Sequence, residues 1–319
     1  MSLGYWPRLG LQLLSVLWLV RTAVGAIVAG LGPAALRGAE RLRPRAAAGL
    51  LFGLRMAPSS LAAAVAMGLA APSYLWLETD RGVERIGWFP LAAGAAVLAG
   101  CACSVGRGLW AVRASRRYLA GCRRLAGFEG GIWVVDGRAG VAALAGVLRP
   151  RVVLSRELAE TLPAEQRDAV LRHERAHGAA GDNLKRLCLR LAPGMFWFRR
   201  RFEALDRGWS RQAEWAADDR AAGGDQQRAL ALAEAIVRVA RAGGEPPGLV
   251  LATPLVDGTA GIAERVERLL DDAPRDAGPG RFEKTAAAAG AAAAAGLAAA
   301  ASYPASMAAV HGFLERLAR

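Results

Sequence analysis

Two of the three histidines in the chain lie in the stretch His173-Glu174-Arg175-Ala176-His177. Residues four apart on a helix share one face, so both imidazoles can reach one metal ion. The carboxylate of Glu174 would then lie beside the open coordination position, where it can take a proton from zinc-bound water. This spacing predicts a helix that holds Zn²⁺ and supplies a general base.

A third ligand is expected from carboxylates further along the chain. Glu214 and Asp218 are four residues apart in a run with helical spacing, Trp209 to Ala222. Glu214 can complete a His-His-Glu site and leave the fourth position to water, while Asp218 can accept the second ring N–H of a ligating histidine. For Asp182 a turn or capping role is favoured, and contact with a ligating histidine is the alternative.

The residues around the motif predict where its helix begins and ends. Thr161 is expected to be the N-cap, and Pro163 lies in the first turn. Gly178 and Gly181 are expected to end or loosen the helix after the second histidine.

A small sheet is expected before this helix. Apolar stretches at 131–136 and 141–146 predict two strands joined as a hairpin, and 152–155 predicts a third strand. An edge strand of such a sheet can hold an extended peptide by backbone hydrogen bonds beside the zinc. A purely structural hairpin is the equal alternative.

The composition indicates a membrane protein. Hydrophobic residues make up 54% of the 319 residues and the mean hydropathy is +0.22, yet the formal net charge is +13. Apolar runs long enough to span a bilayer occur at 10–32, 56–77 and 87–109, and an alanine-rich run at 285–309 is a fourth candidate. Apolar content with many arginines favours spans flanked by basic loops, and contact with membrane lipid, over direct binding of nucleic acid.

The charges beside the spans predict their orientation. The loop after the first span holds four arginines against Glu40, and the loop after the second holds three acidic residues against two arginines. Arginines without any acid follow the third span: Arg107, Arg113, Arg116, Arg117, Arg123 and Arg124. The positive-inside rule then places the N-terminus outside and residues after 110 in the cytoplasm.

Three regions are therefore expected. Residues 1–126 form three transmembrane helices with basic cytoplasmic loops, 127–283 form a cytoplasmic zinc metallopeptidase domain, and 284–319 form a fourth transmembrane helix with a short tail. His311, in that tail, is expected to be solvated or interfacial.

Three further segments of the soluble region carry weaker patterns. Residues 187–198 are interpreted as a membrane-surface segment, with a buried helix as the close alternative. Residues 225–242 and 259–272 predict amphipathic helices. Within the second, Glu264-Arg-Val-Glu-Arg-Leu-Leu270 is expected to be a plain packing helix.

The order of spans and motifs resembles the BlaR/MecR-type antirepressor membrane peptidases. The resemblance rests on the H-E-x-x-H motif and Glu214-Trp-Ala-Ala-Asp218, with agreement at Pro150-Arg-Val-Val-Leu-Ser155, Asp182 and Glu264-Arg-Val-Glu-Arg-Leu-Leu270. It implies an α-helical membrane protein with about four spans and an α+β, gluzincin-like zincin domain. It also implies a multi-pass protein of the bacterial inner membrane.

By this resemblance the protein is a zinc endopeptidase in signal transduction that cleaves a cytoplasmic protein, either a winged-helix transcriptional repressor or itself. The founding members carry a penicillin-binding sensor after the last span, whereas this chain ends at Arg319, so β-lactam sensing by that route is not expected. The E-x-x-A-D motif is also similar to that of heat-shock membrane zinc proteases, which leaves a quality-control protease as one alternative. A non-enzymatic zinc-bound receptor or scaffold is another, and a homo-oligomer is left open.

Overall fold

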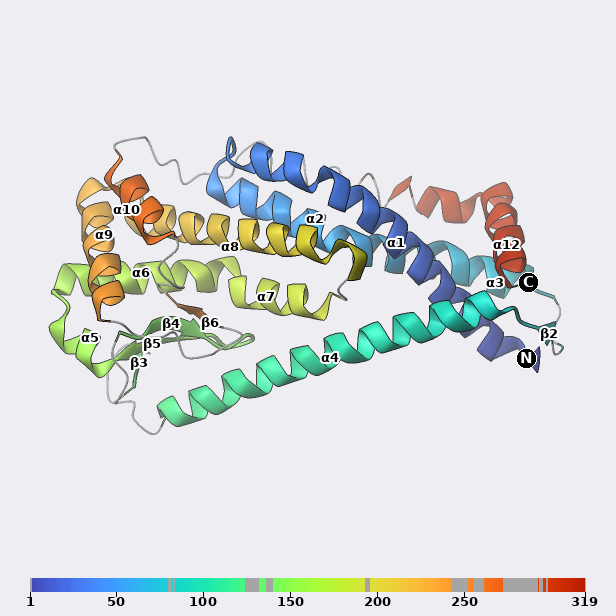
Figure 1. Ribbon diagram of the computed structural model, residues 1–319, viewed down its shortest axis with the longest axis horizontal. Coiled ribbons are helices and arrows are strands. Elements are labelled where there is room, and N and C mark those ends of the chain that lie inside the picture. Colours follow the sequence, from blue (N-terminus) through green and yellow to red (C-terminus); the bar gives the residue numbers. More distant parts are fainter. Residues whose placement is uncertain are drawn as a thin grey trace.

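The computed structural model describes a mostly helical chain with a small mixed sheet at one end (Figure 1). The described residues are 2–79, 82, 84–123, 132–135, 140–192, 196–242, 252–254, 261–271, 292, 295–296 and 298–318. Long helices run along the molecule, and the four-stranded sheet lies at the end opposite to both termini, with several shorter helices around it (Figure 1).

Three helical stretches are long and apolar enough to cross a membrane: Tyr5–Ala39, Pro44–Leu77 and Trp88–Cys122. They correspond to α1 (Tyr5–Ala39), to α2 (Pro44–Val65) continued through a π-helical segment (Ala66–Ala70) into α3 (Ala71–Leu77), and to α4 (Trp88–Arg123). Each stretch is about 50 Å long, whereas the hydrocarbon layer is about 30 Å thick. Part of each helix would therefore extend beyond a bilayer that it crosses.

The ends of these helices on the side of the termini are joined by short elements. β1 (Ser2–Leu3) pairs antiparallel with β2 (Glu84–Arg85), and α12 (Pro304–Ala318) packs against α3. Of the predicted fourth span, 285–309, residues 285–291, 293–294 and 297 lie outside the described residues, so that span stays a prediction.

The sheet has the strand order β3-β5-β4-β6. Its strands are β3 (Ile132–Val135), β4 (Ala142–Ala145), β5 (Arg151–Ser155) and β6 (Ala252–Pro254). β3 runs parallel to β5, and β4 pairs antiparallel with both β5 and β6. The predicted hairpin of 131–136 with 141–146 is wrong, because β5 folds back directly after β4 and takes the place beside β3.

The two faces of the sheet are covered by different helices. Leu144 and Leu154 face the core built with α6, whereas Ala143 and Val153 pack with Leu119 near the end of α4. Side chains alternate between the faces of a strand, so α4 and α6 lie on opposite faces of the sheet.

The remaining helices form the end of the molecule that contains the H-E-x-x-H motif and Glu214 with Asp218. They are α5 (Arg156–Thr161), α6 (Ala164–Ala180), α7 (Asp182–Leu191), a 3-10 turn (Phe196–Phe198), α8 (Arg199–Ala222), α9 (Gln226–Arg241) and α10 (Ile262–Leu270). α9 and α10 correspond to the amphipathic helices predicted at 225–242 and 259–272. α7 packs against α4 and buries Leu189, whereas Leu191 and Trp197 are exposed, so the membrane-surface segment and the buried helix both stay predictions for 187–198.

The motif helix begins and ends differently from the prediction. Ser155 caps the separate helix α5 by accepting a hydrogen bond from the Leu158 amide, and Thr161 ends that helix instead of capping the next one. Pro163 is the N-cap residue of α6. Gly178 remains helical, and Gly181 at φ +69° ends α6, a left-handed conformation that glycine adopts without a steric penalty.

The turn between α1 and α2 packs directly on α8. Leu51, Leu205 and Trp209 are buried in one apolar cluster shared by these three helices. At Gly208 of α8, an added Cβ would come within 2.5 Å of Leu36 in α1, so the missing side chain allows this close approach. α8 is therefore anchored to the first two long helices by a packed core.

Replacing Trp209 by alanine tests this anchoring. Trp209 is 2% exposed, and its removal leaves a cavity that should cost about 3–5 kcal/mol of folding free energy. The matched control is Trp197→Ala, which removes the same side chain from a position that is 71% exposed and should cost less than about 0.5 kcal/mol. Thermal unfolding of the detergent-solubilised variants measures both, and equal effects would contradict the packing described here.

Candidate metal centre

α6 places its two histidines on one face, with their rings turned towards the same point. Both side chains are fully buried, and their Nε2 atoms are 3.1 Å apart. This is the arrangement expected from residues four apart on a helix. Two imidazole nitrogens thus point at one position from the same helix.

Glu214 of α8 completes a group of three. Its Oε2 atom lies 3.5 Å from Nε2 of His173 and 3.5 Å from Nε2 of His177. Two ligands about 2.1 Å from a tetrahedral zinc ion are separated by about 3.4 Å, so this triangle of donor atoms has the size that such an ion requires. The three residues could therefore hold a metal ion.

Two carboxylates fix the orientation of the histidine rings. Asp182, the first residue of α7, lies 2.7 Å from Nδ1 of His177, and Asp218 lies 2.9 Å from Nδ1 of His173. The contact of Asp182 is a hydrogen bond, and Asp218 lies within ion-pair distance. A carboxylate beside Nδ1 favours the proton on that nitrogen and leaves the lone pair of Nε2 for a metal. Asp182 thus contacts a histidine as well as starting a helix, which goes beyond the capping role that was favoured for it.

Glu174 points a buried carboxylate into the same region. It is fully buried, and neither of its oxygens has a hydrogen-bond partner among the residues that the structure describes. Burial raises the pKa of Glu174 to about 7, against the opposing effect of His173 and His177. A carboxylate with such a pKa can both accept and release a proton near neutral pH.

Arg265 of α10 is part of this centre and was not predicted. Its guanidinium donates two hydrogen bonds to Asp218, from Nε at 2.8 Å and from Nη2 at 2.7 Å, and Nη1 lies 3.5 Å from Oε2 of Glu214. The expectation of a plain packing helix at 264–270 is therefore incomplete.

The sequence does contain a signal for Arg265. It stands at helical spacing between Ile262, Val266 and Leu269, which are the apolar residues that α10 packs against the core. An arginine within the apolar stripe of an amphipathic helix requires a buried partner.

The carboxylates strongly favour positive charge at the centre. Burial alone would raise the pKa of Asp218, but Arg265 and His173 hold it at about 2. Burial alone would lower the pKa of His177, but Glu214 and Asp182 raise it to about 10. In both cases the neighbouring charges outweigh desolvation, so a cation at this position is stabilised.

The balance of charge also fits a divalent ion. Four carboxylates meet here, from Glu174, Asp182, Glu214 and Asp218, against the buried cation Arg265 and two partly exposed ones. Arg186 lies 3.6 Å from Glu214 and Lys185 lies 3.2 Å from Asp182, so one negative charge is in excess when all of these groups are charged. An uncompensated buried charge is strongly unfavourable, and an ion bound by the two imidazoles and Glu214 would offset the excess of negative charge.

A second group with suitable atoms lies far from this centre, at the other end of the molecule. Glu78, His311 and Glu315 also come within metal-binding distance of one another. This group differs from the first in two respects: Glu315 is exposed, and Glu78 is 3.5 Å from Nη2 of Arg8. His311, expected to be solvated or interfacial, lies 3.6 Å from Glu315.

Residues 139–269 match the family model described as BlaR1 peptidase M56. The matched segment runs from just before β4 to the end of α10 and contains all the residues of the metal centre named above. The resemblance to BlaR/MecR-type peptidases is thereby confirmed for this part of the chain. No curated protein and no solved structure matches the sequence.

The contacts at Nδ1 of the histidines predict a change in metal affinity. Asp182→Asn and Asp218→Asn should each weaken zinc binding about 10–100-fold, because the amide no longer holds the ring and its proton as the carboxylate does. Asp219→Asn is the matched control, since Asp219 pairs with Arg268 outside the centre. Competition with a chromophoric chelator measures the affinities, and an equal loss in the control would contradict the assignment.

The pair of Arg265 with Asp218 predicts a large effect on stability. Arg265→Gln leaves a buried carboxylate without its guanidinium and should cost about 3–5 kcal/mol. The control is Arg268→Gln, three residues further along α10. It breaks a partly exposed ion pair of 2.7 Å with Asp219, and should cost about 1 kcal/mol of folding free energy or less. Chemical denaturation measures the loss of folding free energy in both variants. Similar losses would show that Arg265 does not offset the buried charge of Asp218.

Proposed function

We propose that this chain, a relative of the BlaR1 peptidases by its segment 139–269, is a membrane-embedded zinc endopeptidase. The observation that carries the proposal is the triangle of donor atoms from His173, His177 and Glu214 beside the buried carboxylate of Glu174. A purely structural metal site would not require that additional carboxylate.

The three ligands would hold Zn²⁺, with Asp218 and Asp182 orienting the rings. Zinc bound there would polarise the scissile carbonyl and lower the pKa of a water molecule to about 7. Glu174 would take the proton of the attacking water and return it to the leaving amine, which is the role that its pKa of about 7 suits.

We further propose that the catalytic end lies in the cytoplasm and that the N-terminus lies outside. Clustered arginines at the end of α4 support this orientation by the positive-inside rule. The fold agrees with one part of this topology: Ala39 and Ala47, on either side of the α1–α2 turn, share a core with α8, and α4 ends against the sheet. The α1–α2 turn and the end of α4 therefore lie on the same side of the membrane as the catalytic end, and the arginines alone support the choice of the cytoplasmic side.

The substrate that we propose is a cytoplasmic protein cleaved in response to a signal, either a winged-helix transcriptional repressor or the chain itself. The family match supports this assignment by analogy. A protease for damaged membrane proteins and a non-catalytic zinc-bound receptor are the competing functions, and the following experiment separates them.

The experiment measures zinc content and cleavage for the detergent-purified protein and for Glu174→Gln. Wild type should contain about one zinc per chain and cleave, whereas Glu174→Gln should keep its zinc and lose cleavage by at least about a hundredfold, because only the proton carrier is removed. The assay offers a co-expressed candidate repressor and unfolded casein as separate substrates.

Two controls make the result decisive. Glu165→Gln changes an exposed glutamate in the first turn of the same helix and should leave zinc and cleavage unchanged. Cleavage retained by Glu174→Gln would rule out the assigned base, and preference for casein over the repressor would favour quality control. Zinc without cleavage of either substrate, or of the chain itself, by the wild type would favour a receptor.

A further inference from the structure

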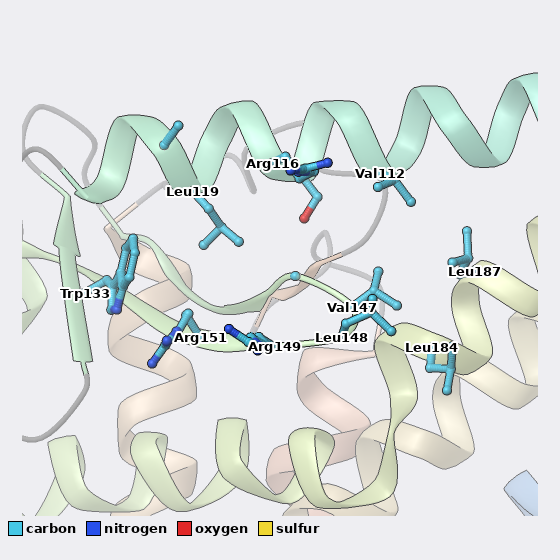
Figure 2. Close-up of a pocket in the computed structure, with 13 residues that line it drawn as sticks. Val112, Arg116, Leu119, Trp133, Val147, Leu148, Arg149, Arg151, Leu184 and Leu187 are labelled. Atoms are coloured by element: carbon cyan, nitrogen blue, oxygen red, sulfur yellow. The ribbon is translucent and has the colours of Figure 1, made fainter.

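A cavity of about 730 Å³ lies between α4, α7 and the turn that joins β4 to β5 (Figure 2). Its volume lies in the range of pockets that hold small molecules. None of the residues of the metal centre lines it, and it adjoins the face of the sheet that α4 covers, opposite to α6. The cavity is therefore distinct from the proposed catalytic site.

One end of this cavity is lined by apolar side chains, and its arginines lie further along α4, where Leu119 and Trp133 also line it (Figure 2). At one end, Val112 of α4 lies opposite Leu184 and Leu187 of α7 (Figure 2). Arg116 lies four residues further along α4, a distance of about 6 Å. Arg149 and Arg151 extend from the opposite wall towards the other end of the cavity (Figure 2).

The polar groups of the cavity are suited to bind an anion. Among the residues that the structure describes, no carboxylate forms an ion pair with Arg116, Arg149 or Arg151, and Arg151 lies against the ring of Trp133. Ser115, also in the lining, is only 2% exposed, and its hydroxyl has no hydrogen-bond partner within the described part of the chain. A ligand with several acceptor oxygens would satisfy these donors.

The position of the cavity relative to the bilayer indicates where such a ligand comes from. A span that begins at Trp88 crosses about 30 Å of hydrocarbon in about 20 residues, so Val112 lies about 6 Å beyond it, in the headgroup layer. Trp110, 59% exposed, has the position of an interfacial aromatic residue. The apolar end of the cavity thus faces the membrane and the arginines lie further from it.

We propose that this cavity binds one anionic phospholipid from the leaflet on the side of the catalytic domain. Its phosphate would lie among Arg116, Arg149 and Arg151, and the first part of an acyl chain would lie against Val112, Leu184 and Leu187. The apolar end lies nearer the bilayer than Arg116, which matches a lipid that enters from the bilayer with its headgroup outermost. The bound lipid would connect α4 to α7, the helix that begins at Asp182.

The test is a lipid titration of the full-length protein in detergent, followed by native mass spectrometry. Phosphatidylglycerol and phosphatidylcholine with the same acyl chains are the probes. We expect one tightly held phosphatidylglycerol per chain and at least about tenfold weaker binding of phosphatidylcholine. Equal binding of the two lipids would overturn the proposal.

Two pairs of substitutions separate this site from general attraction to a basic surface. Arg116→Gln with Arg149→Gln should weaken phosphatidylglycerol binding about tenfold or more. The matched control is Arg113→Gln with Arg117→Gln, which removes the same charge from exposed positions of α4 outside the lining and should leave binding close to that of wild type. Equal weakening by both pairs would contradict a defined site.

Two further arms test the acyl chain. Ala120→Trp places an indole in the cavity while all arginines remain, and should also weaken binding of the lipid about tenfold. Glycerol phosphate at the same concentration should not displace the lipid, and displacement would show a site for soluble phosphates instead. Glu174→Gln should bind phosphatidylglycerol as wild type does, because the cavity is independent of the metal centre.

Discussion

The burial of four carboxylates around two histidines is the constraint on which the rest of this structure depends. Buried charge is costly unless it is paired. Here the paired groups come from four helices. α6 carries the two imidazoles, α7 carries Asp182, α8 carries Glu214 and Asp218, and α10 carries Arg265. A divalent ion between the imidazoles and Glu214 would complete the compensation. The relative positions of these helices are thus fixed by electrostatics as well as by packing.

α8 has a second role, because it connects the metal centre to the membrane segments. It is 24 residues or about 36 Å long, with Leu205 and Trp209 packed on the α1–α2 hairpin and Glu214 and Asp218 in the centre. Any rotation of α8 that follows a movement of the hairpin would also move Glu214 relative to the histidines. The contacts with the hairpin and the proposed catalytic site therefore lie on one continuous helix (Figure 1).

The parts of the centre that the sequence predicts are those set by local periodicity. His173 with His177 and Glu214 with Asp218 are pairs four residues apart, and helical geometry alone places each pair on one face. Arg265 meets Asp218 across 47 residues, and no local pattern specifies that contact. The same limit explains the sheet: β3, β4 and β5 were predicted and β6 was not, and the expected partner of β3 was wrong, because strand pairing depends on the whole fold.

Zinc K-edge X-ray absorption of the purified protein tests the metal centre most directly, because it reports the donor atoms themselves. For the wild type we expect about four nitrogen and oxygen ligands at about 2.0–2.2 Å, with the multiple scattering of two imidazoles. Glu214→Gln should lose one oxygen ligand or the metal itself. A sulfur ligand at about 2.3 Å, or the absence of bound zinc from protein purified without chelators, would contradict it.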